Sequence, residues 1–266
     1  MSSTTSTPSR ITQAFKQAAA EQRAAFIPYI TAGFPNKEAF LGHARTLLEY
    51  ADVLEIGLPY SDPLGDGPTI QKSSETALAN GTHIADAFDF IRQLRQESDK
   101  ALVLMTYYNP IFVYPKGEAG FIQDLKEAGA DGIILPDLPP DEGKSLIAAA
   151  RATSLDTIFL VAPTSTQERL ALVTAACRGF VYAVSVTGVT GARDSLANEV
   201  PDLVARAKAE TTLPIAVGFG VKNAATAKPI AEVADGVVVG SALINTINEN
   251  GDLAALCAEI RQASTK

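Results

Sequence analysis

The chain has 266 residues, of which 47% are hydrophobic and 20% charged, a composition typical of a folded globular protein rather than a disordered one. Its 30 acidic and 22 basic side chains give a net charge of -8. Without a basic block, this charge argues against nucleic acid as a partner. A phosphorylated metabolite stays open as a ligand, because backbone amides can hold a phosphate. No apolar run approaches the ~20 residues that a membrane helix needs.

Two features outside the strands bear on compartment and domain organisation. Cys177 and Cys257 form neither a CxxC motif nor a metal-ligand spacing, so we interpret them as small core residues in a reducing compartment. The first ten residues, MSSTTSTPSR, lack the apolar stretch of a secretory signal. We expect residues 1–9 to be a flexible tail, with the remnant of a transit peptide as the alternative. Residues 10–266 contain no Ser/Gly linker or charge block and are expected to form one domain.

One unit repeats along the chain: a short apolar, β-branched run, a loop rich in small and turn-forming residues, and a helical pattern with a period near 3.6. The apolar runs predict eight strands, at Ala25–Thr31, Val53–Gly57, Leu102–Thr106, Gly132–Leu135, Thr157–Val161, Val181–Ser185, Ile215–Gly218 and Gly236–Val239. The predicted helices are a leading one at Ile11–Ala20 and then Lys37–Glu49, Ile84–Gln96, Gly120–Glu127, Asp141–Ala152, Thr166–Ala176, Glu199–Ala209, Asn223–Val233 and Ser241–Ser264.

Eight strand–helix units predict a parallel sheet with right-handed crossovers. Such a sheet either stays open and doubly wound or closes into a barrel. The loop after the first strand, TAGFPNKEAF (31–40), lacks the GxGxxG that would favour the open sheet. Eight units in about 250 residues match the (β/α)8 TIM barrel, and we predict this α/β fold with an extra N-terminal helix. Its chemistry is expected at the C-terminal ends of the strands.

Glu55 is a catalytic candidate because it lies inside the second predicted strand. By the two-residue alternation of a strand it shares a face with Val53 and Gly57, whereas Leu54 and Ile56 face the helices. On the barrel interior, desolvation would raise its pKa into the range of a general acid or base. A structural glutamate paired with a buried Arg or Lys is the alternative, but no basic residue has a comparable position at another strand end.

The loop YSDPLGDGPTIQ (60–71) holds more carboxylates. Asp62 and Asp66 either cap turns or carry a function, and the residues from Asp66 onward also resemble a helix start. A second carboxylate near Glu55 would give a pair with separated pKa values, as acid–base catalysis requires.

Glycines mark the last two strand ends, in VGFGV (217–221) and in VGSA (239–242), which leads into a helix at Ser241. Amides at a helix N-terminus bind anions, and the loops after strands seven and eight are the usual phosphate site of such barrels. Tight turns are the alternative reading of these glycines. The segment Thr187–Ser195 is interpreted as a mobile loop long enough to cover a site, and Tyr182 fits either the core or the site.

Several other chemistries lack their residues. His43 and His83 do not lie at strand ends, no lysine lies in a predicted strand, and no cluster of acids is dense enough for a catalytic divalent metal. We therefore expect no metal, and carboxylate acid–base catalysis on a phosphate-bearing substrate. The aromatic segment 107–115 either folds over the core or faces a partner.

Several motifs in order along residues 10–264 resemble one family, the tryptophan synthase α chains. The most specific motif is LEIGLPYSDPLGDGPTIQ (54–71), supported by PYITAGFP, ILPDLPPDE, SVTGVTGAR, VGFGV and VGSALI. The resemblance implies the same barrel and a lyase of L-tryptophan biosynthesis. That lyase cleaves indole-3-glycerol phosphate to indole and glyceraldehyde 3-phosphate by a retro-aldol reaction.

The resemblance also implies roles for single residues. Glu55 matches the glutamate that protonates the indole C3 and then takes the glycerol hydroxyl proton, and Asp66 matches the aspartate that holds the indole N–H. Thr190 matches the residue that engages this aspartate when its loop closes. The matched phosphate-binding positions are Gly191, Gly220, Gly240 and Ser241. The matched positions of the apolar indole pocket are Tyr29, Met105 (often Leu in the family), Ile134, Leu160, Tyr182 and Phe219.

The resemblance further implies a partner, a pyridoxal-phosphate-dependent β chain that condenses the indole with serine in an α2β2 assembly. This chain would then need no cofactor of its own, and its contact positions would be Asp62, Pro63, Asn109, Pro110 and Asp137. The expected location is the cytoplasm, or the plastid stroma of a photosynthetic eukaryote. Three alternatives stay open: another phosphate-binding barrel enzyme, a free-standing lyase that releases indole, and a non-catalytic homologue that only activates the β chain.

Overall fold

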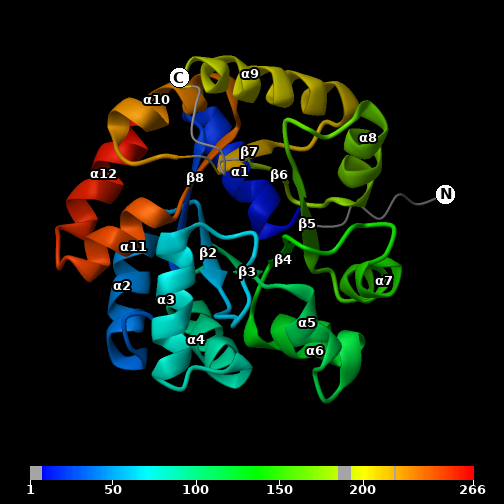
Figure 1. The fold of residues 1–266 in the computed structure, drawn as a ribbon, viewed down its shortest axis with the longest axis vertical. Coiled ribbons are helices and arrows are strands. Elements are labelled where there is room, and N and C mark those ends of the chain that lie inside the picture. The colour runs from blue at the N-terminus through cyan, green and yellow to red at the C-terminus, as the bar shows by residue number, and fades with distance from the viewer. Residues whose placement is uncertain (1–7, 185–192, 219) are drawn as a thin grey trace.

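The structure, a computed structural model, describes residues 8–184, 193–218 and 220–266, with no side-chain description for 193–198. Each strand is followed by one or two helices (Figure 1). The strands are β1 (Ala25–Thr31), β2 (Val53–Gly57), β3 (Ala101–Met105), β4 (Gly132–Leu135), β5 (Asp156–Val161), β6 (Val181–Val184), β7 (Ile215–Gly218) and β8 (Gly236–Val239). The helices are α1 (Arg10–Ala20), α2 (Lys37–Tyr50), α3 (Pro68–Ala79), α4 (Ile84–Glu97), α5 (Tyr108–Phe112), α6 (Gly117–Ala128), α7 (Lys144–Ala152), α8 (Gln167–Ala176), α9 (Arg193–Glu210), α10 (Ala224–Val233), α11 (Ser241–Asn248) and α12 (Leu253–Ala263).

The eight strands close into a barrel in the order of the sequence, each parallel to its neighbours. Closure comes from β1 and β8, where Pro28 pairs with Val239. All helices except α1 surround the strands (Figure 1). The predicted TIM barrel is therefore confirmed.

Two apolar clusters follow from the alternation of side chains along the strands. The inner cluster fills the barrel and includes Ile27, Val53 and Val103. The outer cluster packs between the strands and the helices and includes Leu54 and Ile56. The predicted division of the second strand into an inner and an outer face is therefore confirmed.

Helix α1 closes the N-terminal end of the barrel. Its apolar residues Ile11 and Phe15 belong to the inner cluster, and the Phe15 ring lies 5.4 Å from that of Phe180. In Figure 1 the dark blue α1 accordingly lies among the strands rather than in the outer ring. Helix α1 therefore covers the end of the barrel opposite to the C-terminal mouth, where the site is predicted.

The N-terminal face is held by a repeated pattern that the sequence also carries. An Ala-Asp dipeptide directly precedes β2, β4 and β8. In each case the Asp accepts a backbone N–H from the preceding strand of the barrel and pairs with a cation. Asp52 accepts from Phe26 N and Arg23, Asp131 accepts from Leu102 N and Arg95, and Asp235 accepts from Ile215 N and Lys208.

Several helix predictions need correction. The single helix expected at Ser241–Ser264 is wrong, because Asn250 adopts a left-handed φ of 53° and Asp252 caps a second helix through Ala255 N. Helix α3 was anticipated only by its start and is a full helix of 12 residues. Helix α7 begins at Lys144 rather than Asp141, after a turn in which Gly143 N donates to Pro139 O.

The predicted burial of both cysteines is confirmed. Cys177 and Cys257 are buried and unpaired. His83 is the N-cap residue of α4, and its backbone N–H donates to Asp86. Within the described ranges, no helix combines the length and the apolar character needed to cross a membrane.

Candidate active site

Glu55 lies on the inner face of β2, in register with Tyr29 of β1 and Val103 of β3. Its side chain is 1% exposed, and neither carboxylate oxygen has a hydrogen-bond partner in the described part of the chain. Burial raises the pKa of Glu55 to about 8, with a further contribution from the charge of Asp66. Glu55 is therefore a neutral acid at pH 7, and no Arg or Lys in the described ranges pairs with it.

Asp66 lies in the loop between β2 and α3, half-buried, and its backbone N–H donates to Pro63 O. Burial raises its pKa to about 6, and a hydrogen bond from the Tyr107 hydroxyl opposes the rise. Two carboxyl groups whose pKa values are separated in this way can act as a proton donor and an anionic acceptor at the same pH.

Tyr107 contacts the loop that carries Asp66 through a hydrogen bond and a ring stack. Its hydroxyl accepts a hydrogen bond from Gly65 N at 3.0 Å, and its ring stacks on Tyr60 with centroids 5.2 Å apart. Tyr107 was not among the predicted site residues, although its place two residues after the end of β3 (Met105) puts it at the mouth of the barrel.

The predicted indole-pocket residues within the described ranges come from five different strands and face the interior. Ile134 belongs to the inner cluster, and Tyr29 is buried. Met105, Leu160 and Tyr182 are half-buried and pack against the same cluster. Together these side chains give the mouth an apolar wall on β1, β3, β4, β5 and β6. Phe219 lies outside the described residues.

The predicted phosphate positions follow β7 and β8, which are neighbours in the barrel. Gly240 is the N-cap residue of α11, whose first residue is Ser241. The first N–H groups of a helix have no partner inside the helix and can therefore bind an anion. Gly220 has a φ of +54°, which favours glycine, and a Cβ there would meet nothing within 4 Å. Thr190 and Gly191 lie outside the described residues.

The predicted contact positions lie on three loops at the same mouth. Asp62 and Pro63 follow β2, Asn109 and Pro110 lie in α5, and Asp137 follows β4. Asp137 accepts from Tyr108 N at 2.9 and 3.2 Å, which ties two of these loops together.

The predicted contact positions and their neighbours differ in exposure. Pro110 is buried, whereas Leu64, Phe112 and Val113 are exposed by 92%, 67% and 63%. Leu64 was not among the predicted contact residues, whereas Phe112 and Val113 lie in the aromatic segment 107–115 that was considered for a partner. Within the aromatic segment 107–115, Ile111 is buried and Phe112 is exposed, so the segment packs on the core with only part of its side chains.

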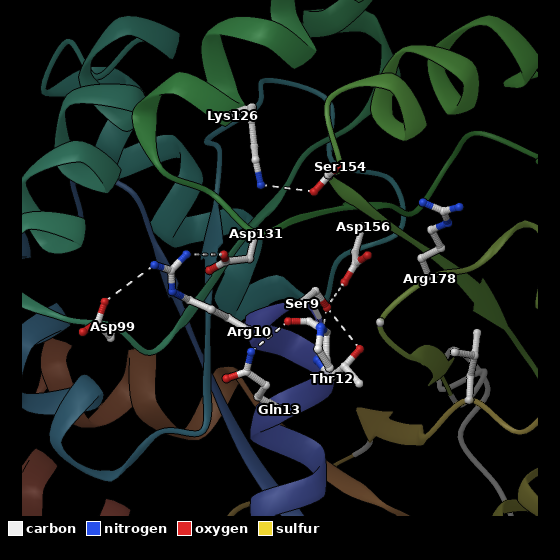
Figure 2. A pocket seen from close by; sticks show the side chains of 13 residues that line it. Ser9, Arg10, Thr12, Gln13, Asp99, Lys126, Asp131, Ser154, Asp156 and Arg178 are labelled. Atoms are coloured by element: carbon white, nitrogen blue, oxygen red, sulfur yellow. Dashed lines mark hydrogen bonds and ion pairs between the residues drawn. The ribbon is translucent and has the colours of Figure 1, made fainter. Parts of the chain in front are cut away.

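A hollow lies at the opposite, N-terminal face, around the start of α1 (Figure 2). Its polar groups are largely used by one another: Ser9 donates to Asp156 at 2.6 Å, and Arg10 contacts Asp131 and Asp99. Lys126 donates to Ser154 O. Two of these contacts join the start of α1 to aspartates at the starts of β4 and β5, on the face associated with stability in this fold. Among the described residues, no group of three or more His, Cys, Asp or Glu side chains could hold a metal ion.

Comparisons with known proteins agree on one family. The sequence model described as "Tryptophan synthase alpha chain" matches residues 15–266. A Tryptophan synthase alpha chain of Deinococcus radiodurans is 53% identical over 252 residues, covering 94% of this chain and 93% of that one. One from Roseiflexus castenholzii is 45% identical, with coverages of 94% and 97%. A solved chain of Mycobacterium tuberculosis tryptophan synthase superimposes with a TM-score of 0.90 at 43% identity, covering 98% of this chain and all of that one.

Proposed function

This chain belongs to the tryptophan synthase alpha chain family, and we propose that it cleaves indole-3-glycerol phosphate to indole and glyceraldehyde 3-phosphate. The observation that carries the proposal is the pair formed by Glu55, a buried carboxyl group without a described partner, and Asp66 beside it. The phosphate-binding arrangement after β7 and β8 and the apolar wall of the mouth fit the two ends of that substrate.

The reaction assigns a different task to each carboxyl group. Glu55, protonated at neutral pH, donates its proton to the indole C3, which turns the ring into an indoleninium cation. Asp66, ionised, accepts a hydrogen bond from the ring N–H and stabilises that cation. The electrons of the bond between C3 and the glycerol carbon then return to the ring. The hydroxyl on that carbon becomes the aldehyde, and its proton goes back to Glu55.

The decisive experiment measures release of glyceraldehyde 3-phosphate from indole-3-glycerol phosphate, with Glu55→Gln as the blank. The amide keeps the shape but cannot transfer the proton, so turnover should disappear while phosphate binding remains. Glu55→Gln activity within tenfold of the wild type would overturn the acid–base role. No release by a folded wild type, with or without a β chain, would favour the non-catalytic alternative.

We also propose a β chain as the partner, in an α2β2 assembly, with pyridoxal phosphate on that chain and none on this one. Support comes from the exposed apolar side chains of Leu64 and Phe112, which lie beside the polar contact positions at the catalytic mouth. Exposed apolar groups rimmed by polar ones are typical of interfaces. Phe112→Asp should weaken co-sedimentation with a tryptophan synthase β chain, whereas Leu172→Asp, on the outer helix α8, should not. Fast indole release without any β chain would instead identify a free-standing lyase.

A further inference from the structure

Three hydroxyl groups form a continuous chain from the barrel mouth to helix α3. The Tyr29 hydroxyl lies 3.1 Å from Thr31 Oγ1, which lies 2.6 Å from Ser73 Oγ. Ser73 Oγ in turn donates to Ile70 O at 2.8 Å. The side chains of Tyr29, Thr31 and Ser73 are 6%, 0% and 1% exposed, so water has little access to these hydrogen-bonded hydroxyl groups.

The direction of the hydrogen bonds follows from counting protons, since each hydroxyl has one. Ser73 donates its proton to Ile70 O, so its oxygen accepts from Thr31, and Thr31 accepts from Tyr29. All three protons are then satisfied within the protein. The reverse direction would leave the Tyr29 proton without a described acceptor in a buried site, which costs free energy. The Tyr29 oxygen therefore presents only lone pairs to the mouth.

Tyr29 lies between the proposed phosphate site, which follows β8, and Glu55 on β2. Its strand β1 runs between β8, which leads to Gly240 and Ser241, and β2, which carries Glu55. A Cβ on Gly240 would lie 3.5 Å from Tyr29 Cδ1, and a Cβ on Gly57 would lie 2.1 Å from the Tyr29 hydroxyl. The Tyr29 side chain thus spans the gap between the proposed phosphate site and the proposed acid.

We propose that the Tyr29 hydroxyl accepts a hydrogen bond from a hydroxyl group of the substrate's three-carbon side chain, and that Thr31 and Ser73 are positioning residues that hold its lone pairs toward the mouth. The inference rests on the proposed function. In indole-3-glycerol phosphate, this side chain joins the phosphate to the indole C3, which Glu55 would protonate. Tyr29 would then determine specificity for a hydroxylated chain, in addition to forming part of the apolar wall.

Tyr29→Phe isolates the hydroxyl, because the ring and its packing stay. The measurements are kcat and KM for indole-3-glycerol phosphate and the inhibition constant of 3-(indol-3-yl)propyl phosphate, which lacks both side-chain hydroxyls. A neutral hydrogen bond predicts a fall of kcat/KM by about threefold to tenfold, with less than a twofold change for the deoxy compound. Tyr50→Phe, on the outer helix α2, is the matched control and should change neither value.

Ser73→Ala tests whether the hydrogen bonds from Tyr29 through Thr31 to Ser73 orient the Tyr29 hydroxyl. Without Ser73 Oγ the Thr31 proton can turn to Tyr29, so discrimination between the two compounds should fall as in Tyr29→Phe. In the Tyr29→Phe background the same change should have no further effect on discrimination. An equal loss for both compounds in Tyr29→Phe, or no loss for either, would overturn the inference.

Failure of the proposed function would look different. In that case the wild type would release no glyceraldehyde 3-phosphate. Calorimetric dissociation constants of the two compounds for the wild type and Tyr29→Phe would then decide the role of the hydroxyl on their own. Selective loss for the hydroxylated compound supports the inference, and parallel behaviour of both compounds overturns it.

Discussion

Asp66 helps to keep the proton on Glu55. Burial within the barrel is the larger cause of the raised pKa of Glu55, and the negative charge of Asp66 adds to it. Asp66 itself lies at the half-buried edge of the mouth and ionises at about pH 6. The two carboxyl groups thus hold opposite protonation states between about pH 6 and about pH 8, which is the state that the proposed cleavage requires.

The cleavage should have a bell-shaped pH profile. With Asp66 needed as the anion and Glu55 as the acid, kcat/KM should rise through about pH 6 and fall through about pH 8. Asp66→Asn should slow the reaction, remove the acidic limb, and move the alkaline limb to lower pH, because the charge that raises the pKa of Glu55 is gone. An alkaline limb that stays in place in Asp66→Asn would contradict the coupling of the two groups.

Glu55→Gln should stabilise the fold more at high pH than at low pH. The folded state binds the Glu55 proton more tightly than the unfolded state does, with a pKa of about 8 against 4.5. The free energy of unfolding of the wild type therefore falls as the pH rises through this window, whereas the amide does not titrate. The advantage of Glu55→Gln over the wild type in free energy of unfolding should be larger above pH 8 than at pH 5 by on the order of 4 kcal/mol. Urea denaturation at pH 5 and pH 9 measures it, and an equal difference at both would show that the carboxyl group titrates normally.

Gly57→Ala should disable the site. The new Cβ would lie 2.1 Å from the Tyr29 hydroxyl, so the ring must be displaced. We expect a fall of kcat/KM of at least tenfold. Gly42→Ala lies at an exposed position of α2, where a Cβ meets nothing within 4 Å, and should leave activity unchanged and stabilise the fold by about 0.5–1 kcal/mol. Equal activities of the two variants would show that Tyr29 tolerates displacement.

Asp131→Ala should cost stability rather than catalysis. Asp131 accepts from Leu102 N and pairs with Arg95 and Arg10 at the N-terminal face. Removing one partner of a buried pair costs ~3–5 kcal/mol. Lys72→Ala, which breaks an exposed pair with Glu75, should cost less than ~1 kcal/mol. Thermal unfolding compares the two, and a change in KM for Asp131→Ala would mean that the faces are coupled.

The sequence predicted most of the fold because its signals are local. Alternation placed Glu55 on the inner face of β2, and Gly240 and Ser241 were located by a glycine directly before a helix. The helix expected at Ser241–Ser264 was wrong for an equally local reason, since the left-handed turn at Asn250 was not recognised. Residues such as Tyr107 and Ser73 escaped notice because their roles depend on partners that sequence order does not reveal.

The amino-acid sequence by itself determined the eight strand–helix units, the inward carboxylate and the family, because periodicity, turn chemistry and motif spacing are written along the chain. Only the tertiary structure decided which distant groups meet. Thr31 and Ser73 are 42 positions apart and reach hydrogen-bond distance only because α3 packs over β1. The pKa values of Glu55 and Asp66 likewise depend on burial and on each other's charge, which exist only once the barrel has closed.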